Sequence, residues 1–188
     1  MIRANAEVFD GEWFKTGDLG RIDEDGYIHI TGRKKEIYVS SGGKNVAPLV
    51  IEETMKSIPV LSQFFLVGDG RKYCSALVTL DVGVILRDNL GMNPDKVPKD
   101  PIEQIEELER RGHKLSDFVE SEEIRSDIES QIMELNKRFM NPEQVKKFTI
   151  LPRDLNIDSG ELTPTLKIRR KQIRENWADE IEAMYSDA

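Results

Sequence analysis

Hydrophobic side chains recur every three or four positions in several stretches of the chain, and this spacing predicts amphipathic helices. Over residues 47–58, Ile51, Met55 and Ile58 share one helical face, and Pro48 suits the first turn. Similar stretches predict further helices over residues 82–90, 102–111, 122–140, 168–175 and 179–185. Within the 122–140 helix, an apolar stripe at near-heptad spacing predicts a face packed in the core, at Ile124, Ile128, Ile132 and Leu135.

Shorter runs of apolar and β-branched residues predict strands between these helices. The strands are expected over residues 63–68, 72–80 and 147–151. Near the N-terminus, two strand-like runs flank Asp25 and Gly26, an Asp-Gly pair that is typical of a hairpin turn. The interleaved order predicts an α+β fold with a small mixed sheet packed with helices. A hairpin alone buries little, so residues 1–32 are expected to pack on something outside this sequence.

The overall charge restricts the classes of partner. The 188 residues are 38% hydrophobic and 33% charged, with a formal net charge of -8. This balance argues against nucleic acid as the main partner, and it gives no electrostatic reason to bind an anionic membrane. An anionic ligand would need a local cluster of cations. We find no signal peptide and no apolar run long enough to span a bilayer, so a cytoplasmic protein is expected, and peripheral attachment to a membrane stays open.

Cysteine and histidine offer little chemistry. Cys74 is the single cysteine and falls in a predicted buried strand, where a packed, inert thiol is expected. His29 and His113 lie far apart and lack the spacing of metal ligands, so no metal site is predicted.

One stretch combines cations, a short strand and a glycine turn. Three cations at residues 33–35 precede a β-branched and aromatic run, and then comes a turn made of Ser41, Gly42, Gly43 and Lys44. Tandem glycines allow a backbone to approach a ligand closely, and the flanking cations suit a phosphorylated ligand. An isolated Gly-Gly pair is nevertheless more often a simple surface turn.

Two further blocks lie before and after that stretch. Asp18 ends a Thr-Gly-Asp turn, where its carboxylate can accept both hydrogen bonds from a ribose diol, although a turn aspartate more often bonds its own backbone. Lys167 follows a loop that holds Gly160 and Pro164, and two arginines come soon after it. Most lysines are ordinary surface cations, so spacing alone does not single it out.

Taken in order, the Thr-Gly-Asp block, the 31–48 stretch and residues 160–170 resemble the C-terminal part of the AMP-forming acyl-CoA synthetases, in the superfamily of adenylate-forming enzymes. The pattern is most similar to bacterial long-chain fatty acid–CoA ligases, and the resemblance covers nearly the whole chain. It implies that residues 1–34 are the C-terminal tail of a large N-terminal AMP-binding domain. Residues 35–188 would then form the mobile C-terminal domain of such an enzyme.

The resemblance also implies roles for single residues. Lys167 matches the lysine that bridges the substrate carboxylate and the α-phosphate during adenylation, and Lys35 matches the hinge about which the C-terminal domain turns. Asp18 and Arg33 match nucleotide-binding positions, with Asp18 on the ribose. The segment that faces the active site in the thioester-forming conformation, and would bind CoA, corresponds to Ser41, Gly42, Gly43 and Lys44.

The implied reaction has two halves. A fatty acid carboxylate attacks the α-phosphate of ATP with Mg²⁺, giving acyl-adenylate and pyrophosphate. The domain then turns about Lys35, which withdraws Lys167 and brings in the Gly42 loop, and the CoA thiol gives acyl-CoA and AMP. The family's phosphate-gripping loop, adenine pocket and acyl tunnel are absent from this sequence, so we expect a fragment that is inactive alone, binds none of these substrates tightly and needs its N-terminal domain as partner.

Two other functions stay open at the level of sequence. One is an adenylation domain that loads a carrier protein instead of CoA. The other is a stand-alone, non-catalytic binding module, in which Lys167 and Gly42 are ordinary surface residues. A preference for long acyl chains rests on analogy, because the acyl pocket is not in this sequence.

Overall fold

A three-stranded mixed sheet forms the centre of the molecule, in a computed structural model that describes residues 8–186. The strands lie in the order β7 (Leu61–Val67), β8 (Cys74–Leu80) and β9 (Val145–Ile150). β7 and β8 are antiparallel, whereas β8 and β9 are parallel, and every residue of β8 is buried. The predicted small mixed sheet is therefore confirmed, with strand ends that differ from the prediction by at most two residues.

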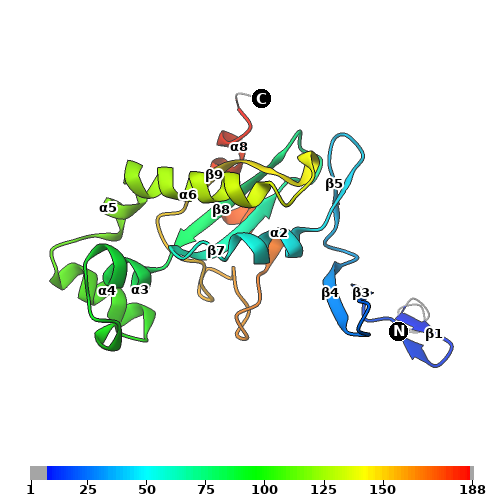
Figure 1. Cartoon of the computed structure of the whole chain (residues 1–188), viewed down its shortest axis with the longest axis horizontal. Coiled ribbons are helices and arrows are strands. Elements are labelled where there is room, and N and C mark those ends of the chain that lie inside the picture. Colours follow the sequence, from blue (N-terminus) through cyan, green and yellow to red (C-terminus); the bar gives the residue numbers. More distant parts are fainter. Residues whose placement is uncertain (1–7, 187–188) are drawn as a thin grey trace.

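Helices cover both faces of this sheet (Figure 1). Successive side chains of a strand point to opposite faces, so β7 sends Phe64 and Leu66 to one core and Phe65 and Val67 to the other. The first core includes side chains from α2 (Pro48–Met55) and α6 (Glu122–Asn136). The second includes side chains from α7 (Arg170–Asn176) and α8 (Ala178–Ala183).

The predicted apolar stripe of α6 is confirmed. Ile124, Ile128 and Ile132 are buried in the first core, and Leu135 packs partly buried against it. The helix ends at Asn136, four residues before the predicted end. The Asn136 side chain pairs with the backbone of Val145, accepting from its N–H at 3.0 Å and donating to its carbonyl at 2.8 Å. This contact with β9 fixes the end of the helix, and sequence spacing does not reveal it.

The region between β8 and α6 is more broken than the spacing predicts. Asp81 caps the segment after β8 as expected, because its Oδ1 accepts from the Val84 N–H at 3.0 Å. The predicted 82–90 helix is a short α turn followed by a π-helical turn, and the sequence pattern does not predict the short helix at Leu115–Val119. The elements are α3 (Val82–Val84), η1 (Ile85–Asn89), η2 (Pro94–Lys96), α4 (Pro101–Arg110), α5 (Leu115–Val119) and η3 (Asn141–Glu143).

The first hairpins of the chain precede the main body and extend away from it (Figure 1), whereas the third contributes Tyr38 and Val46 to the first core. The predicted Asp-Gly hairpin is confirmed as β3 (Asp18–Ile22) paired with β4 (Ile28–Arg33). Its large apolar side chains are exposed, with Ile22 at 70% and Ile28 at 72%. The other short pairs are β1 (Phe9–Asp10) with β2 (Trp13–Phe14), and β5 (Tyr38–Val39) with β6 (Asn45–Val46).

Two further expectations can be compared with the structure. Cys74 is buried as predicted, and burial raises the pKa of its thiol to about 11, which suits an inert side chain. Among residues 8–186, no helix has both the length and the apolar character needed to cross a bilayer.

Candidate functional site

Lys167 lies on a tight, exposed loop after β9. The Thr163 N–H donates to the Lys167 carbonyl at 2.9 Å, and the Lys167 N–H donates back to Thr163 Oγ1 at 3.0 Å. Leu166 adopts a left-handed conformation with φ of 58°, which turns the chain at the tip. The loop therefore has a defined backbone, while the Lys167 side chain extends into solvent.

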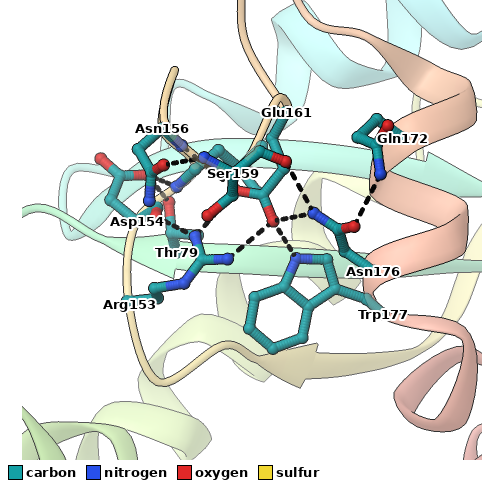
Figure 2. A network of polar contacts seen from close by, with 10 residues as sticks. Thr79, Arg153, Asp154, Asn156, Ser159, Glu161, Gln172, Asn176 and Trp177 are labelled. Carbon is teal, nitrogen blue, oxygen red and sulfur yellow. Dashed lines mark hydrogen bonds and ion pairs between the residues drawn. The ribbon is translucent and has the colours of Figure 1, made fainter.

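The base of this loop rests on a buried carboxylate (Figure 2). Glu161 is fully buried, and both of its oxygens accept hydrogen bonds from Arg153, at 2.7 and 2.9 Å. The Trp177 indole donates at 2.8 Å, the Asn176 amide at 3.1 Å and the Asn156 backbone N–H at 3.2 Å. The Arg153 guanidinium also lies over the Trp177 ring, 4.9 Å from its centroid. We call these five residues the Glu161 cluster.

The cluster keeps Glu161 ionised. Burial by itself would raise the pKa of this carboxyl, but the hydrogen bonds from Arg153 and Asn176 outweigh it and hold the pKa below its usual range. For Arg153, the hydrogen bond to Glu161 is the largest influence, and it raises the pKa of the guanidinium. The pair is thus fully charged at neutral pH, and each charge is compensated.

The glycine turn forms the tip of the β5–β6 hairpin. The Ser40 N–H donates to the Lys44 carbonyl at 2.9 Å, and Ser40 Oγ accepts from the Lys44 N–H at 3.2 Å. Gly43 has a φ of 73°, which favours glycine, whereas a Cβ at Gly42 would meet nothing closer than Ser40 Oγ at 3.9 Å. Ser41 through Lys44 are all exposed.

A second loop supports this turn. The Ser41 N–H donates to the Arg71 carbonyl at 3.1 Å, and the Gly70 N–H donates to the Val39 carbonyl at 3.0 Å. The β7–β8 turn therefore braces the glycine turn through backbone groups. Arg71 is itself paired with Glu182 of α8, so the last helix contributes to this support.

A buried ion pair joins α2 to α7. The Arg170 guanidinium donates to both oxygens of Glu52, at 2.8 and 2.6 Å, and its Nε lies 3.2 Å from a carboxylate oxygen of Glu36. Glu52 also accepts from the Leu66 N–H at 2.8 Å, and the Tyr38 hydroxyl donates to the Leu66 carbonyl at 2.8 Å. Burial would lower the pKa of Arg170, but pairing with Glu52 raises it above its usual value. This pair ties the segment after Lys167 to the residue that follows Lys35.

Asp18 and Arg33 face one another across the β3–β4 hairpin. They are opposite in register, and Asp18 Oδ1 lies 3.2 Å from Arg33 Nε. The Asp18 N–H donates to Thr16 Oγ1 at 3.1 Å. Lys35 follows in an exposed turn directly after β4, and a cleft of about 540 Å³ lies between that turn and α7. The arrangement brings the two predicted nucleotide-binding residues together beside the predicted hinge.

The predicted residues form three separate places rather than one site. The Lys167 loop and the glycine turn project to different sides of the molecule (Figure 1). The local sequence patterns do not single out Glu161 and Arg153, which support the Lys167 loop, or Glu52 and Arg170, which form the buried ion pair. Glu161 and Arg170 lie within the 160–170 block, but their partners lie outside it, 8 residues away for Arg153 and 118 for Glu52.

The chain is similar to known proteins along almost its whole length. A family model described as the AMP-binding enzyme C-terminal domain matches residues 35–116 and 108–188. The chain is 39% identical over 189 residues to the long-chain fatty acid–CoA ligase FadD15 of Mycobacterium tuberculosis, covering 98% of this chain and 28% of that protein. It is 36% identical over 192 residues to the human long-chain fatty acid–CoA ligase ACSBG1, covering 100% of this chain and 26% of that protein. The chain thus spans little more than a quarter of the length of these relatives.

A solved structure shares the fold. The adenylation domain of the carboxylic acid reductase from Segniliparus rugosus, in complex with AMP and a co-purified carboxylic acid, matches with a TM-score of 0.69. The match is 21% identical and covers 99% of this chain and 25% of that one. It confirms the predicted α+β fold of the C-terminal domain of adenylate-forming enzymes.

Proposed function

We propose that this chain comes from an enzyme that joins long-chain fatty acids to CoA. The chain belongs to the family of AMP-binding enzyme C-terminal domains, and it is the C-terminal domain of an AMP-forming acyl-CoA ligase. The reaction would convert ATP, fatty acid and CoA into acyl-CoA, AMP and pyrophosphate. The observation that carries the proposal is the 39% identity, over 98% of the chain, to a protein named a long-chain fatty acid–CoA ligase. CoA is favoured over a carrier protein because relatives with 33–39% identity are named as long-chain fatty acid–CoA ligases.

We place the domain boundary directly after the β3–β4 hairpin. Residues 1–34 would be the C-terminal tail of a large N-terminal AMP-binding domain, with residues 1–7 outside the described part of the chain, and residues 35–188 would be the mobile domain. Three observations support this division. The family match begins at residue 35, the hairpin side chains of Trp13 and Ile28 are exposed, and the relatives are several times longer. The missing N-terminal domain would be the main partner, and without it the chain would be inactive.

In the adenylation half, Lys167 would carry the chemistry that this chain supplies. Its exposed ammonium would bridge the fatty acid carboxylate and the α-phosphate of ATP, where negative charge develops in the transition state. Asp18 would hold the ribose hydroxyls, and the paired Arg33 would lie beside the same nucleotide. Mg²⁺ would enter with ATP as part of the substrate, and we assign no residue of this chain to it.

In the thioester half, the domain would turn about Lys35. An exposed residue in a turn between two strands can change its dihedrals without disrupting a core, and Lys35 meets that requirement. The rotation would withdraw Lys167 and bring in Ser41, Gly42, Gly43 and Lys44. The bare backbone at Gly42 would leave room for a thin pantetheine arm, and Lys44 would meet a phosphate of CoA.

The decisive experiment is Lys167→Ala in the full-length enzyme that carries these residues. Pyrophosphate release from ATP and palmitate should fall by about 100-fold, the size seen when one electrostatic contact to a transition state is lost. Conversion of supplied palmitoyl-adenylate to palmitoyl-CoA should persist. The matched control is Lys171→Ala, because Lys171 is a neighbouring lysine with a 90% exposed side chain. An unchanged adenylation rate in Lys167→Ala would leave the non-catalytic module as the better explanation.

The fragment itself provides a second test. Residues 1–188 incubated with ATP, Mg²⁺, palmitate and CoA should release no pyrophosphate, because the groups that grip the phosphates would lie in the N-terminal domain. Clear release from the purified fragment would refute the proposed division of labour between the domains.

A further inference from the structure

The Glu161 cluster (Figure 2) has no part in the chemistry outlined above, yet Glu161 lies at the base of the Lys167 loop, where its carbonyl pairs with the Arg169 N–H. Its donors come from separate segments of the chain. Arg153 and Asn156 belong to the loop after β9, whereas Asn176 and Trp177 end α7. The carboxylate of Glu161 is fully buried and receives five hydrogen bonds from them.

Stability alone is a poor reason for such a cluster. Glu161 is fully buried, whereas the Arg153 side chain stays partly exposed. The cost of taking the carboxylate out of water offsets much of its attraction to the guanidinium, and apolar side chains of the same volume often stabilise a protein as well or better. A fully satisfied polar network does confer a unique geometry, because each hydrogen bond has a preferred direction. Arg153 fixes the plane of the Glu161 carboxylate through two parallel hydrogen bonds, and Trp177 fixes it from another side.

The backbone of Glu161 transmits this geometry to Lys167. The Glu161 carbonyl accepts from the Arg169 N–H at 2.8 Å, which closes the base of the loop. The next pairing toward the tip joins Thr163 and Lys167 through their backbones at 2.9 Å. Two steps of backbone pairing therefore connect the buried carboxylate to the exposed lysine.

We propose that Glu161 is a positioning residue for adenylation, whose fixed carboxylate holds the Lys167 loop in the orientation that delivers the ammonium to the carboxylate and α-phosphate. The proposal rests on the function proposed above for Lys167. Glu161 does not touch the substrates, so it acts through Lys167 alone and has no role in the thioester half.

Glu161→Gln in the full-length enzyme tests this role, since glutamine keeps the shape and removes the charge. Pyrophosphate release should fall by about 10- to 100-fold, as expected when a contact is misplaced by about 1 Å. Palmitoyl-CoA formation from supplied palmitoyl-adenylate should change by less than about 2-fold. If Glu161 were purely structural, the variant would slow both half-reactions together, and that result would overturn the proposal. An unchanged adenylation rate would overturn it as well.

A double-mutant cycle shows whether Glu161 acts through the lysine. In the Lys167→Ala background, Glu161→Gln should slow adenylation by less than about 3-fold further, because the group that it positions is already gone. Full additivity of the two losses would overturn the proposal. The matched control is Glu175→Gln, which removes an exposed carboxylate of α7 that lies 3.7 Å from Lys171.

A milder variant covers the case in which Glu161→Gln fails to fold. Trp177→Phe removes one donor to the carboxylate and keeps an aromatic ring under Arg153. It should slow adenylation by about 3- to 10-fold and leave the thioester half unchanged, whereas an unchanged adenylation rate would overturn the proposal.

The two proposals fail differently. An unaffected Lys167→Ala enzyme rejects the function of Lys167, while a slow Lys167→Ala enzyme beside an unaffected Glu161→Gln enzyme rejects only the positioning role.

Discussion

The Lys167 loop and the glycine turn both present an exposed lysine on a tight turn, but they are supported in different ways. The Lys167 loop rests on a buried carboxylate held by side chains from the loop after β9 and from the end of α7. The glycine turn is shaped by its own backbone and Ser40 Oγ, and it is braced by backbone bonds to the β7–β8 turn. The difference matches the proposed tasks. A point charge needs a precise position, whereas a passage for a thin ligand needs backbone free of side chains.

The largest expected effect comes from removing the buried ion pair between Arg170 of α7 and Glu52 of α2. Arg170→Ala leaves the nearly buried Glu52 carboxylate without its partner, which should reduce the free energy of unfolding by about 3 kcal/mol. Urea unfolding followed by tryptophan fluorescence measures the change. Arg169→Ala is the control, because Arg169 is exposed. A loss below about 1 kcal/mol would show that neither loop depends on this pair.

The next effect separates the two loops by function. Gly42→Leu fits the domain, because a Cβ there meets nothing within 3.4 Å, so the fold and adenylation should be preserved. The thioester half should slow by about 10-fold or more, since the side chain enters the proposed passage for pantetheine. Separate assays of pyrophosphate release and of palmitoyl-CoA formation measure this split. Equal rates for both halves would remove the glycine turn from the CoA path.

A smaller effect tests the claim that the glycine turn is held by its own backbone. Gly43 adopts a φ of 73°, so Gly43→Ala should reduce the free energy of unfolding by about 1 kcal/mol, although space is available. Gly42→Ala, at an ordinary φ, is the matched control and should be close to neutral. Thermal unfolding of the two variants measures the difference, and equal stability would mean that the turn relaxes at no cost.

The smallest expected effect is a dependence on pH at the Glu161 cluster. The folded pKa of Glu161 lies below its usual value of 4.5, so the carboxylate adds stability above pH 4.5 that is lost as the pH falls through the folded pKa. The urea concentration at the midpoint of unfolding should therefore differ less between the native chain and Glu161→Gln as the pH falls below 4.5. A difference that is the same at pH 7 and pH 3 would show that the charge of Glu161 contributes nothing to stability.

Local patterns predicted most of the elements and failed where long-range packing decides the local structure. The α6 stripe and the β3–β4 hairpin needed only spacing and turn residues, because each depends on neighbours in the chain. The π-helical turn after α3 was missed because it depends on packing around residues 85–89 rather than on sequence period. The early end of α6 was missed for the same reason, since Asn136 pairs with a strand nine residues away.

The candidate residues divide along the same line. Asp18, Arg33, Lys35, the glycine turn and Lys167 were proposed from three short blocks of sequence. The groups that support Lys167 were not, because Trp177, which follows α7, meets Glu161 only when that helix packs against the sheet.

Local sequence patterns specify the order of the elements, the small mixed sheet and the exposed loops, because these follow from the spacing of apolar residues and from turn chemistry that acts over a few positions. The pairing of buried charges depends instead on how the folded chain packs. Arg170 selects Glu52 across 118 positions, and Trp177 selects Glu161 across 16. A buried charge must find a partner wherever the fold places one, and no local pattern encodes that choice.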